Sequence, residues 1–352
     1  MKNTPKTVYV GLSGGVDSSV AAYRLKKQGH TVVGVFIKVW QPEFLTCNWE
    51  MERLDAMRVA AHLKIPFLTF DAEAAYKQKV ADYMIDEYRR GRIPNPDVMC
   101  NTHVKFGVFL DFALQDGADF VATGHYARVQ NRKGQYDLLR GVDTEKDQSY
   151  FLWMLDQEQL AHTLFPVGDT KKRHIREEAA RAGLPTSDKP DSQGVCFLGE
   201  IDMKEFLSHY VPQQTGDVLN ERGVVVGTHD GALFYTLGQR HGFTITTHET
   251  RREPRYVIGK NLDANTITVG NAPVKREGQT YTLAQCNFIG ELTETLFAQF
   301  RYRQKPFAVT LTHDGGRAML TVQDTDIEAA PSGQSAVLYA GERCLGGGIL
   351  ET

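Results

Sequence analysis

The sequence predicts an α/β protein in which a mostly parallel sheet is followed by a β-rich region. Over roughly the first 200 residues, short apolar runs alternate with amphipathic helical stretches, a pattern typical of a parallel sheet covered by helices on both faces. From about residue 215 the helical period disappears, and short alternating runs separated by Gly, Asn and Asp replace it. The 352 residues, 41% of them hydrophobic, correspond to about two or three domains.

The first part is predicted to alternate strands and helices in the order of a parallel sheet. The expected strands are residues 7–12, 31–39, 67–70 and 120–123, and the expected helices are residues 16–28, 51–63, 77–90 and 105–115. Gly29 follows the first helix at a position where glycine commonly ends helices. The crossovers should be right-handed, and ligands of such sheets bind beyond the carboxyl ends of the strands.

The β-rich part is predicted to divide into two units. Strands are expected near residues 224–226, 256–258, 266–269, 307–311, 318–322 and 336–339. A boundary near residues 271–273 separates a small linking module from a C-terminal barrel of about six strands. The expected domains are therefore residues 1–205, 206–275 and 276–352.

Composition excludes several classes of protein. The sequence has no run of 18 apolar residues, so no membrane-spanning helix is expected, and its first residues lack a signal-peptide core. An odd number of widely spread cysteines argues against a secreted disulfide framework and predicts a cytoplasmic protein; they are Cys47, Cys100, Cys196, Cys286 and Cys344. With a net charge of −3, binding to a nucleic acid would need a local basic patch.

A glycine-rich loop between the first strand and the first helix predicts a phosphate site. Its glycines allow a close approach of the backbone, and the helix N-terminus supplies N–H groups and a favourable dipole. The loop comprises Ser13, Gly14, Gly15, Val16, Asp17, Ser18 and Ser19. It lacks the lysine of a Walker A loop and the spacing of a dinucleotide fingerprint. Asp17 is unexpected beside phosphate and is interpreted as a Mg²⁺ partner. The alternative interpretation of the whole loop is a tight turn with an N-cap that serves only the fold.

Two cysteines lie in segments that contain glycine and proline. Two prolines predict that residues 91–101 form a rigid loop before the helix at 105–115, with Asp97 three residues before Cys100. Cys196 lies in a similar segment, residues 189–199. Their expected loop positions favour a chemical role for both thiols, while Cys286 and Cys344 are expected to pack inertly and the role of Cys47 stays open. No Cys-x-x-Cys pair supports a zinc site.

Two basic sets are candidates for RNA binding. Residues 301–305 place three basic side chains beside Tyr302, and a second set comprises residues 239–241, Arg251, Arg252 and Arg255. RNA offers phosphates to arginine and lysine and unstacked bases to tyrosine. A solvated strand face explains either set alone equally well.

The glycine-rich loop resembles the PP-loop of the ATP pyrophosphatase superfamily. That resemblance implies a Rossmann-like sheet of the adenine-nucleotide α-hydrolase type and cleavage of ATP between its α- and β-phosphates. It also implies that Ile37 packs against adenine and that Gly124 leaves backbone room for ATP. The residues implied to line the phosphates are Gly11, Leu12, Ser13, Gly14, Gly15, Val16, Asp17 and Ser18.

The loop and the two cysteine segments together resemble the MnmA-type tRNA-specific 2-thiouridylases over nearly the whole chain. The matching strings are GLSGGVDSS (11–19), GRIPNPD (91–97), ATGHY (122–126), KDQSYFL (146–152), LFPVG (164–168), DSQGVCF (191–197), YTLGQR (235–240), RYRQ (301–304) and PSGQSAV (331–337). So many ordered matches are typical of family membership.

The resemblance implies a reaction and its residues. In that family ATP adenylates O2 of uridine 34, the wobble base of the tRNAs for Lys, Glu and Gln, and a cysteine persulfide then delivers sulfur to C2. Cys196 would carry the persulfide, Cys100 would release the sulfur or form a disulfide with Cys196, and Asp97 would act as acid or base. The residues implied to contact tRNA are Asn95, Pro96, Asp97, His125, Lys146, Asp147, Gln148, Arg301, Tyr302 and Gln334.

The implied organisation is a catalytic PP-loop domain, a linking domain and a barrel that binds the anticodon stem-loop. The implied cofactors are ATP and Mg²⁺, and the sulfur donor would be a cysteine desulfurase or a sulfur-relay protein. Two alternatives remain: a PP-loop ligase acting on a small molecule, and a non-catalytic, nucleotide-gated RNA-binding module.

Overall fold

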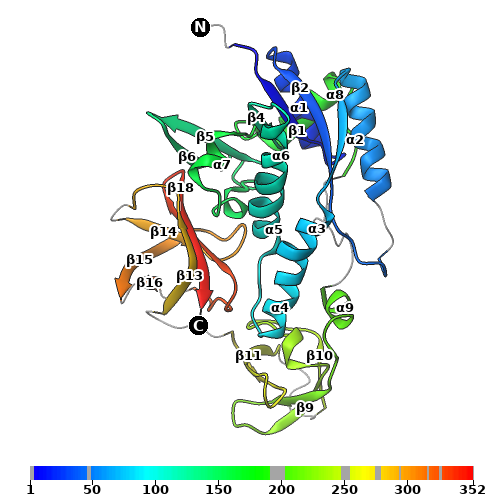
Figure 1. Ribbon diagram of the computed structural model, residues 1–352. Coiled ribbons are helices and arrows are strands. Elements are labelled where there is room, and N and C mark those ends of the chain that lie inside the picture. Colours follow the sequence, from blue (N-terminus) through cyan, green and yellow to red (C-terminus); the bar gives the residue numbers. More distant parts are fainter. Residues whose placement is uncertain are drawn as a thin grey trace.

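The computed structural model describes residues 4–45, 49–190, 203–246, 254–273, 279–292, 295–314, 317–324 and 327–351. It contains three sheets, in the strand orders β3-β2-β1-β4-β7, β10-β9-β8-β12-β11 and β13-β16-β15-β14-β17-β18-β6-β5. Figure 1 shows the first sheet and its helices above, the second sheet below and the third sheet at the side. None of the described helices has the length and hydropathy needed to span a membrane.

The first sheet is parallel, as the sequence predicted. Its strands are β1 (Thr7–Gly11), β2 (Thr31–Lys38), β3 (Phe67–Asp71), β4 (Phe120–Ala122) and β7 (Thr163–Leu164). Residues of β1 alternate between two cores, because successive side chains point to opposite faces. Val8 and Val10 pack in one core and Tyr9 in the other.

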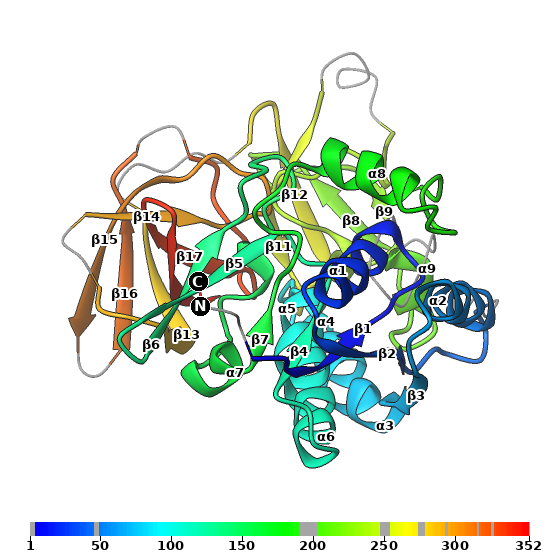
Figure 2. The ribbon, with the colours of Figure 1, turned by 90° about the horizontal axis from the view of Figure 1, so that it is seen from above.

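Helices cover both faces of this sheet. The core that holds Val8 and Val10 is covered by α1 (Val16–Lys27), α2 (Trp49–Leu63) and α8 (Lys172–Arg181). The opposite core is covered by α3 (Glu73–Tyr76), the π-helical turn Lys77–Asp82, α4 (Tyr83–Arg89) and α6 (Phe109–Gln115). Figure 2 shows α1, α2 and α8 grouped around β1 and β2. The four helices expected from the sequence are therefore present, and the third one begins earlier, at Glu73.

Only part of the segment predicted as a loop is irregular: residues 91–95 are, but from Pro96 onward the chain is helical and the prediction was wrong. Helix α5 (Pro96–Met99) continues into the π-helical segment Cys100–Val108. Pro96 suits the first helical position because its missing N–H would be unpaired there, and the side chain of Asn95 accepts a hydrogen bond from Val98 N at 3.4 Å. Pro96 thus starts a helix instead of preventing one, while Pro94 lies in the irregular segment before it.

The third sheet contains the predicted barrel. Its six strands are β13 (Thr280–Phe288), β14 (Leu296–Gln299), β15 (Phe307–Asp314), β16 (Arg317–Val322), β17 (Ser335–Ala340) and β18 (Arg343–Glu351). Pairing of β13 with β18 closes the barrel around Tyr281, Phe300 and Leu320. Three of these strands, β13, β14 and β18, were not among the strands expected from the sequence, and β18 is rich in glycines. Those glycines are needed, since a Cβ at Gly346 would lie 1.9 Å from the carbonyl oxygen of Asn287.

A hairpin from the first part of the chain extends the barrel sheet. Strands β5 (Ala127–Arg132) and β6 (Gln135–Arg140) pair with each other, and β6 pairs with β18 through Leu138 and Leu139. Figure 2 shows this hairpin between the parallel sheet and the barrel. The sequence analysis placed no strand here, and the hairpin joins the two parts of the molecule.

The second sheet forms the small middle module. It consists of β8 (Gly216–Leu219), β9 (Val225–His229), β10 (Phe243–Ile245), β11 (Tyr256–Asn261) and β12 (Thr266–Gly270), and α9 (Met203–Ser208) precedes it. All its pairings are antiparallel except β12 with β8. Lys260 Nζ donates to the carbonyl oxygen of Gly91 at 2.6 Å, so the module contacts the chain just after α4. The remaining elements are α7 (Gln157–Ala161) and the 3₁₀ turns Ser149–Phe151 and Ala232–Phe234.

Candidate functional site

The glycine-rich loop lies where β1 ends and α1 begins, and its backbone conformation requires glycine. Gly14 has a φ of +72°, and a Cβ there would lie 2.6 Å from the carbonyl oxygen of Glu52. Gly15 is the N-cap residue of α1, and no side chain in the described chain caps the helix there. The first N–H groups of a 12-residue helix therefore face this loop, an arrangement suited to an anion.

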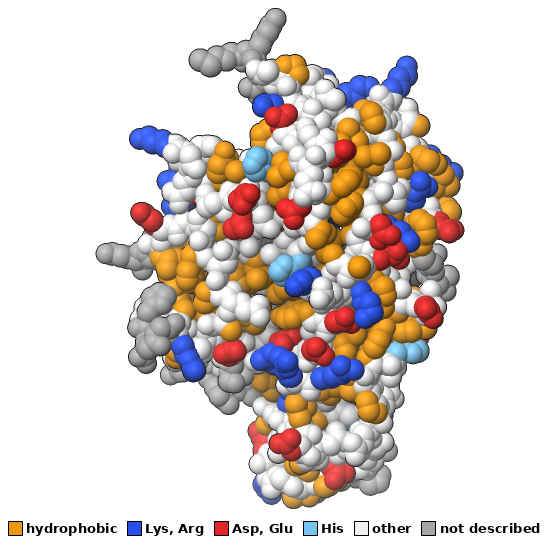
Figure 3. Space-filling view, in the orientation of Figure 1, with side chains coloured by type: hydrophobic (Ala, Val, Ile, Leu, Met, Phe, Trp, Pro, Cys, Tyr) orange, Lys and Arg blue, Asp and Glu red, His pale blue; other side chains and the backbone are white. Residues whose placement is uncertain are grey.

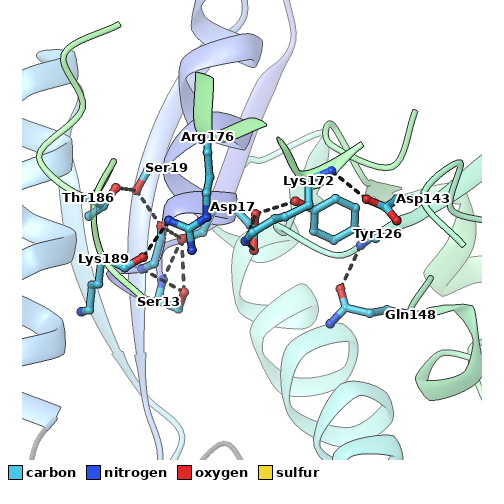
Figure 4. Close-up of polar contacts among 12 residues, drawn as sticks. Ser13, Asp17, Ser19, Tyr126, Asp143, Gln148, Lys172, Arg176, Thr186 and Lys189 are labelled. Carbon is cyan, nitrogen blue, oxygen red and sulfur yellow. Dashed lines mark hydrogen bonds and ion pairs between the residues drawn. The ribbon is translucent and has the colours of Figure 1, made fainter. Parts of the chain in front are cut away.

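Serine hydroxyls hold the loop in shape. Ser18 Oγ and Ser19 Oγ both donate to the carbonyl oxygen of Gly15, at 3.1 and 2.8 Å. Ser18 Oγ also accepts from the backbone N–H of Ser13 at 3.2 Å, and Thr186 donates to Ser19 Oγ at 2.9 Å. Figure 4 shows these contacts around the start of α1. The hydroxyls therefore define the loop before any ligand enters it.

Three further residues implied by the resemblance lie around the same loop. A Cβ at Gly11 would lie 3.7 Å from Ile37 Cδ1, so the ends of β1 and β2 are adjacent. A Cβ at Gly124, just after β4, would lie 2.6 Å from the backbone nitrogen of Ser18. Gly11, Ile37 and Gly124 thus meet at the carboxyl ends of parallel strands, where ligands of such sheets bind.

The carboxylate of Asp17 has two partners that the sequence analysis did not include. Lys172 Nζ lies 2.8 and 2.7 Å from its two oxygens, and Tyr126 OH donates to it at 2.7 Å. Figure 4 shows Lys172 reaching from α8 to Asp17 beside the Tyr126 ring. Among the described residues, no group of three or more His, Cys, Asp or Glu side chains could hold a metal ion. The role of Asp17 as a Mg²⁺ partner stays a prediction, and its carboxylate pairs with Lys172 in this structure.

More cations from the segment that follows β7 lie near the loop. Lys189 Nζ contacts Asp55 at 2.8 Å, and Arg176 donates to the carbonyl oxygens of Ser187 and Lys189 at 3.2 and 3.0 Å. Burial alone would raise the pKa of Asp55, but Lys189 and Arg58 lower it. For Lys172 the sequence contained a signal of an unusual position, although not of its partner Asp17. Positive charge in the first turn of a helix is unfavourable, so a basic start to α8 points to another use of its charges.

Cys100 is the first residue of the π-helical segment and is 2% exposed. Helical geometry places Asp97 and Cys100, three residues apart, on one side of the segment. The next residue, Asn101, donates to the carbonyl oxygen of Phe151 at 3.0 Å and accepts from Lys105 Nζ at 3.0 Å. The expected loop position of this thiol was wrong, because it is buried in a helix.

The other cysteines divide into three cases. Cys344 is buried, and burial raises its pKa to about 12, which agrees with inert packing. Cys286 is exposed, so the expectation that it packs inertly was wrong. Cys47, Cys196 and the suggested pairing of Cys100 with Cys196 lie outside the described residues.

Several residues implied to contact tRNA converge on residues 91–97. Gln334 donates to the carbonyl oxygen of Ile93 at 2.9 Å, and the N–H of Ile93 donates to the carbonyl oxygen of Ser332 at 2.8 Å. The side chain of Asn95 hydrogen-bonds the Tyr150 hydroxyl, which donates to the carbonyl oxygen of Phe300 at 3.0 Å. The barrel and the parallel-sheet domain therefore meet at the start of α5.

The aromatic pair Phe151 and Tyr302 connects the same regions, with ring centroids 4.7 Å apart. Arg303, over the Tyr302 ring at 5.1 Å, donates to the carbonyl oxygen of Glu145 at 3.1 Å. Arg301 is half-exposed and faces Glu328 at 3.5 Å. These contacts bring Arg301 and Tyr302 toward the segment that contains Lys146, Asp147 and Gln148.

Two of those residues have internal contacts. Asp147 is buried and accepts hydrogen bonds from Gly141 N, Ser149 N and Arg140. Gln148 accepts from the backbone N–H of Tyr126 at 2.9 Å. Both side chains therefore order the turn that carries Lys146.

His125 lies between Phe106 and Phe165, with ring centroids 5.9 and 6.0 Å away. Its Nδ1 is 2.6 Å from Thr123 Oγ1. Burial and then the charge of Lys105 lower the pKa of His125 well below its ordinary value. The ring is therefore neutral at physiological pH.

Charges are mixed over the molecular surface. On the face seen in Figure 3, Lys and Arg side chains are interspersed with Asp and Glu, in keeping with the small net charge. In the second basic set, Arg240 lies over the Tyr256 ring at 5.3 Å, while Arg251 and Arg252 lie outside the described residues. Residues 301–305 therefore remain a local candidate for RNA binding.

Comparison with protein families defines the class of the first domain. Residues 6–200, more than half of the chain, match the family described as "tRNA methyl transferase HUP domain". Residues 204–271 match "tRNA methyl transferase PRC-barrel domain", and residues 279–350 match "Aminomethyltransferase beta-barrel domain". The protein is therefore a HUP-domain protein with two further β-domains, and its Rossmann-like parallel sheet and six-stranded barrel agree with this class.

Curated relatives give the particular family. The tRNA-specific 2-thiouridylase MnmA of Enterococcus faecalis is 44% identical, over 99% of this chain and 96% of that protein. The protein of the same name from Lysinibacillus sphaericus is 45% identical, over 98% and 94%. The chain belongs to the family of MnmA-type tRNA-specific 2-thiouridylases. Among solved structures, a 4-thiouridine synthetase–RNA complex with bound ATP is 20% identical over 59% of this chain and 50% of that chain, with a TM-score of 0.35.

Proposed function

We propose that this protein is a tRNA 2-thiouridylase, a sulfurtransferase that replaces O2 of the wobble uridine by sulfur in the tRNAs for Lys, Glu and Gln. The observation that carries the proposal is the similarity to proteins of that name over nearly the full chain. The arrangement of the described residues is compatible with it. A phosphate-type loop, a helix bearing Asp97 and Cys100, and a group of basic and aromatic residues belong to one contiguous assembly.

ATP is the proposed nucleotide, bound at the carboxyl ends of β1, β2 and β4. Residues Gly11 to Ser18 would surround its phosphates, since the uncapped start of α1 and the φ of Gly14 suit an anion. Ile37 would pack against adenine, and Gly124 would keep the β4 end close to α1. Mg²⁺ would arrive with ATP, held by phosphate oxygens and water, because Asp17 already pairs with Lys172.

The proposed chemistry divides one difficult exchange into two easier ones. Uridine O2 attacks the α-phosphorus, pyrophosphate leaves with the bonding electrons, and the N3 proton passes to a base, for which Asp97 is the candidate. The terminal sulfur of a Cys196 persulfide then attacks C2, and AMP leaves. Cys100 attacks the inner sulfur of Cys196, so that a Cys100–Cys196 disulfide forms and the sulfur stays on the base. A reductant must reopen this disulfide before the next cycle.

The RNA would lie along the junction between the sheet domain and the barrel. Asn95, Pro96 and Asp97 are the candidates for contact with the flipped uridine, and His125, Lys146, Arg301 and Tyr302 for contact with the surrounding RNA. Asp147, Gln148 and Gln334 would act through the turns that they order, because their observed bonds are internal.

The proposed domains are residues 1–205 for catalysis, 206–275 for linking and 276–352 for RNA binding. A persulfide-carrying protein, either a cysteine desulfurase or a sulfur-relay protein, is the proposed sulfur donor, and the cytoplasm is the proposed location. These assignments follow from the family rather than from a contact in the structure.

A single experiment tests the proposed function. The purified protein is incubated with tRNA, ATP, Mg²⁺ and a persulfide donor, and the tRNA is analysed by mass spectrometry alongside AMP formation. Exchange of oxygen for sulfur at the wobble uridine, together with tRNA-dependent AMP, supports it. AMP formation without tRNA would favour the small-molecule ligase, and tRNA binding without AMP would favour the RNA-binding module. A gain of a methyl group would favour the activity named in the family descriptions.

A further inference from the structure

Lys172 occupies a position that its own helix disfavours. It is the first residue of α8, where the helix dipole repels a positive charge, and it is 9% exposed. The ammonium group lies 2.7 and 2.8 Å from the oxygens of Asp17, in the first turn of α1. A buried cation at this position does not stabilise α8, so its presence indicates another role for Lys172.

The backbone around Lys172 is fixed from two sides. Asp143 Oδ2 accepts the N–H of Lys172 at 2.8 Å, which satisfies the first free amide of α8. Arg24 of α1 pairs with Glu178 of α8 at 2.7 Å and donates to the carbonyl oxygen of Pro166 at 2.8 Å. The packing of α8 on α1 therefore sets the position of the ammonium group relative to the glycine-rich loop. Figure 4 shows Lys172 with its contacts to Asp17 and Asp143.

The loop itself has no cation. Its string Ser13 to Ser19 ends without the lysine that a Walker A loop supplies, although ATP brings about four negative charges to such a site. The ammonium of Lys172 is held at α1 by Asp17, two residues after the N-cap Gly15. Lys172, from a helix far away in the sequence, thus places beside this loop the positive charge that the loop itself lacks.

We propose that Lys172 binds the β,γ-phosphate portion of ATP and that Asp17, with Tyr126, positions it for this role. The inference rests on the proposed function, which places ATP in this loop. The phosphate oxygens, which carry more charge than a single carboxylate, compete with Asp17 for the ammonium group. Asp17 is then a positioning residue for Lys172.

The decisive experiment compares Lys172→Met with Lys171→Met, which removes the same charge from the adjacent, exposed lysine. Binding of ATP, pyrophosphate and AMP is measured calorimetrically in the full-length protein without tRNA. Lys172→Met should lower the affinities for ATP and pyrophosphate about tenfold or more, because a charge-assisted hydrogen bond is lost. The affinity for AMP should stay within about twofold of the wild-type value. Lys171→Met should leave all three unchanged. Lys172→Arg should recover part of the affinity.

A purely structural role for the ion pair gives different results. Lys172→Met leaves Asp17 without its cation, which destabilises the fold, and the double variant Asp17→Asn/Lys172→Met removes both charges together. The double variant should recover thermal stability but not ATP affinity. Wild-type ATP affinity in either variant, or an equal decrease for ATP and AMP, overturns the inference. A shift of the Mg²⁺ requirement in Asp17→Asn with normal ATP affinity in Lys172→Met would also overturn it, in favour of Asp17 as a metal ligand. Failure of the wild-type protein to bind ATP would instead refute the proposed function.

Discussion

At the scale of single residues, the position of Cys100 in the fold bears on whether its thiol is reactive or only packs in the core. The thiol is 2% exposed in a helix, and free cysteine is often buried for packing alone. Asp97 on the same side of the helix and the hydrogen-bonded Asn101 beside it distinguish this thiol from Cys344, which lies within the barrel sheet. Its proposed role requires the segment that carries Cys196 to approach α5.

The cysteines give the first prediction. Cys100→Ser and Cys196→Ser should each abolish 2-thiouridine formation while ATP binding stays within about twofold, because a serine hydroxyl neither forms a persulfide nor attacks one. Quantification of 2-thiouridine by mass spectrometry measures the first effect and calorimetry the second. Cys286→Ser, at an exposed thiol of β13, is the control and should retain full activity. Full sulfur incorporation by either active-site variant would contradict the assignment.

His125 gives a prediction about pH. Its pKa is lowered in the folded protein by burial and Lys105, whereas the unfolded chain has a value of about 6.5. The unfolded state therefore binds more protons as the pH falls below about 6.5, and folding stability decreases in that direction. His125→Asn keeps an acceptor for Thr123 and should flatten the dependence of the urea midpoint on pH between about 5 and 7.5. The exposed His241→Asn should leave that dependence as it is, and an unchanged slope in His125→Asn would show that the pKa of His125 does not differ between the folded and unfolded states.

At the scale of elements, close backbone contacts set the site. The end of β4 and the start of α1 approach each other at Gly124, where a Cβ would meet Ser18 N at 2.6 Å and the carbonyl carbon of Asp17 at 2.8 Å. Backbone atoms cannot rotate away as a flexible side chain can. The glycine therefore determines the separation between the two elements that hold the proposed nucleotide.

Gly124→Ala should consequently be destabilising by about 1–3 kcal/mol and should weaken ATP binding, since the added methyl group pushes β4 and α1 apart. Urea denaturation and calorimetric ATP binding measure the two effects. Gly259→Ala in β11 is the matched control, because its Cβ would have only ordinary contacts at 3.6–3.7 Å. If Gly124→Ala kept wild-type stability and ATP affinity, the close approach would have no functional consequence.

At the scale of the whole molecule, the barrel is joined to the sheet domain at several points. Strand β6 extends the barrel sheet, the Arg140 guanidinium lies 3.7 Å from the centroid of the Tyr339 ring, and Gln334 bonds Ile93. These contacts join the barrel, which carries residues 301–305, directly to the domain that contains α5. An RNA that contacts both regions would bind to a preformed surface.

The proposed surface gives a prediction about salt. When a basic side chain that neutralises one RNA phosphate is removed, the slope of log affinity against log salt should decrease by about 0.7–0.9. Arg301→Ala should therefore lower the slope for tRNA by about this amount, and fluorescence anisotropy over a salt series measures it. Lys27→Ala, at the carboxyl end of α1 and away from the glycine-rich loop, should leave the slope unchanged. Equal slopes for Arg301→Ala and the wild type would show that Arg301 binds no phosphate of the RNA.

The sequence by itself determined the local features of this protein. The alternation of strands and helices, the glycine-rich turn at residues 13–19 and the barrel of about six strands follow from periodicity, turn residues and the backbone freedom of glycine, which act over short stretches of chain. The start of a helix at Pro96 was also encoded locally, by Asn95 and Pro96, although the prolines were interpreted as loop residues.

Only the tertiary structure decided which distant residues meet. The pairing of Lys172 with Asp17, the union of β6 with β18 and the contact of Gln334 with Ile93 join residues far apart in sequence. Such contacts depend on how helices pack on the sheet and on which strand edges remain open, and neither property is visible in a window of neighbouring residues. The phosphate loop could therefore be recognised from the sequence, but the cation beside it could not.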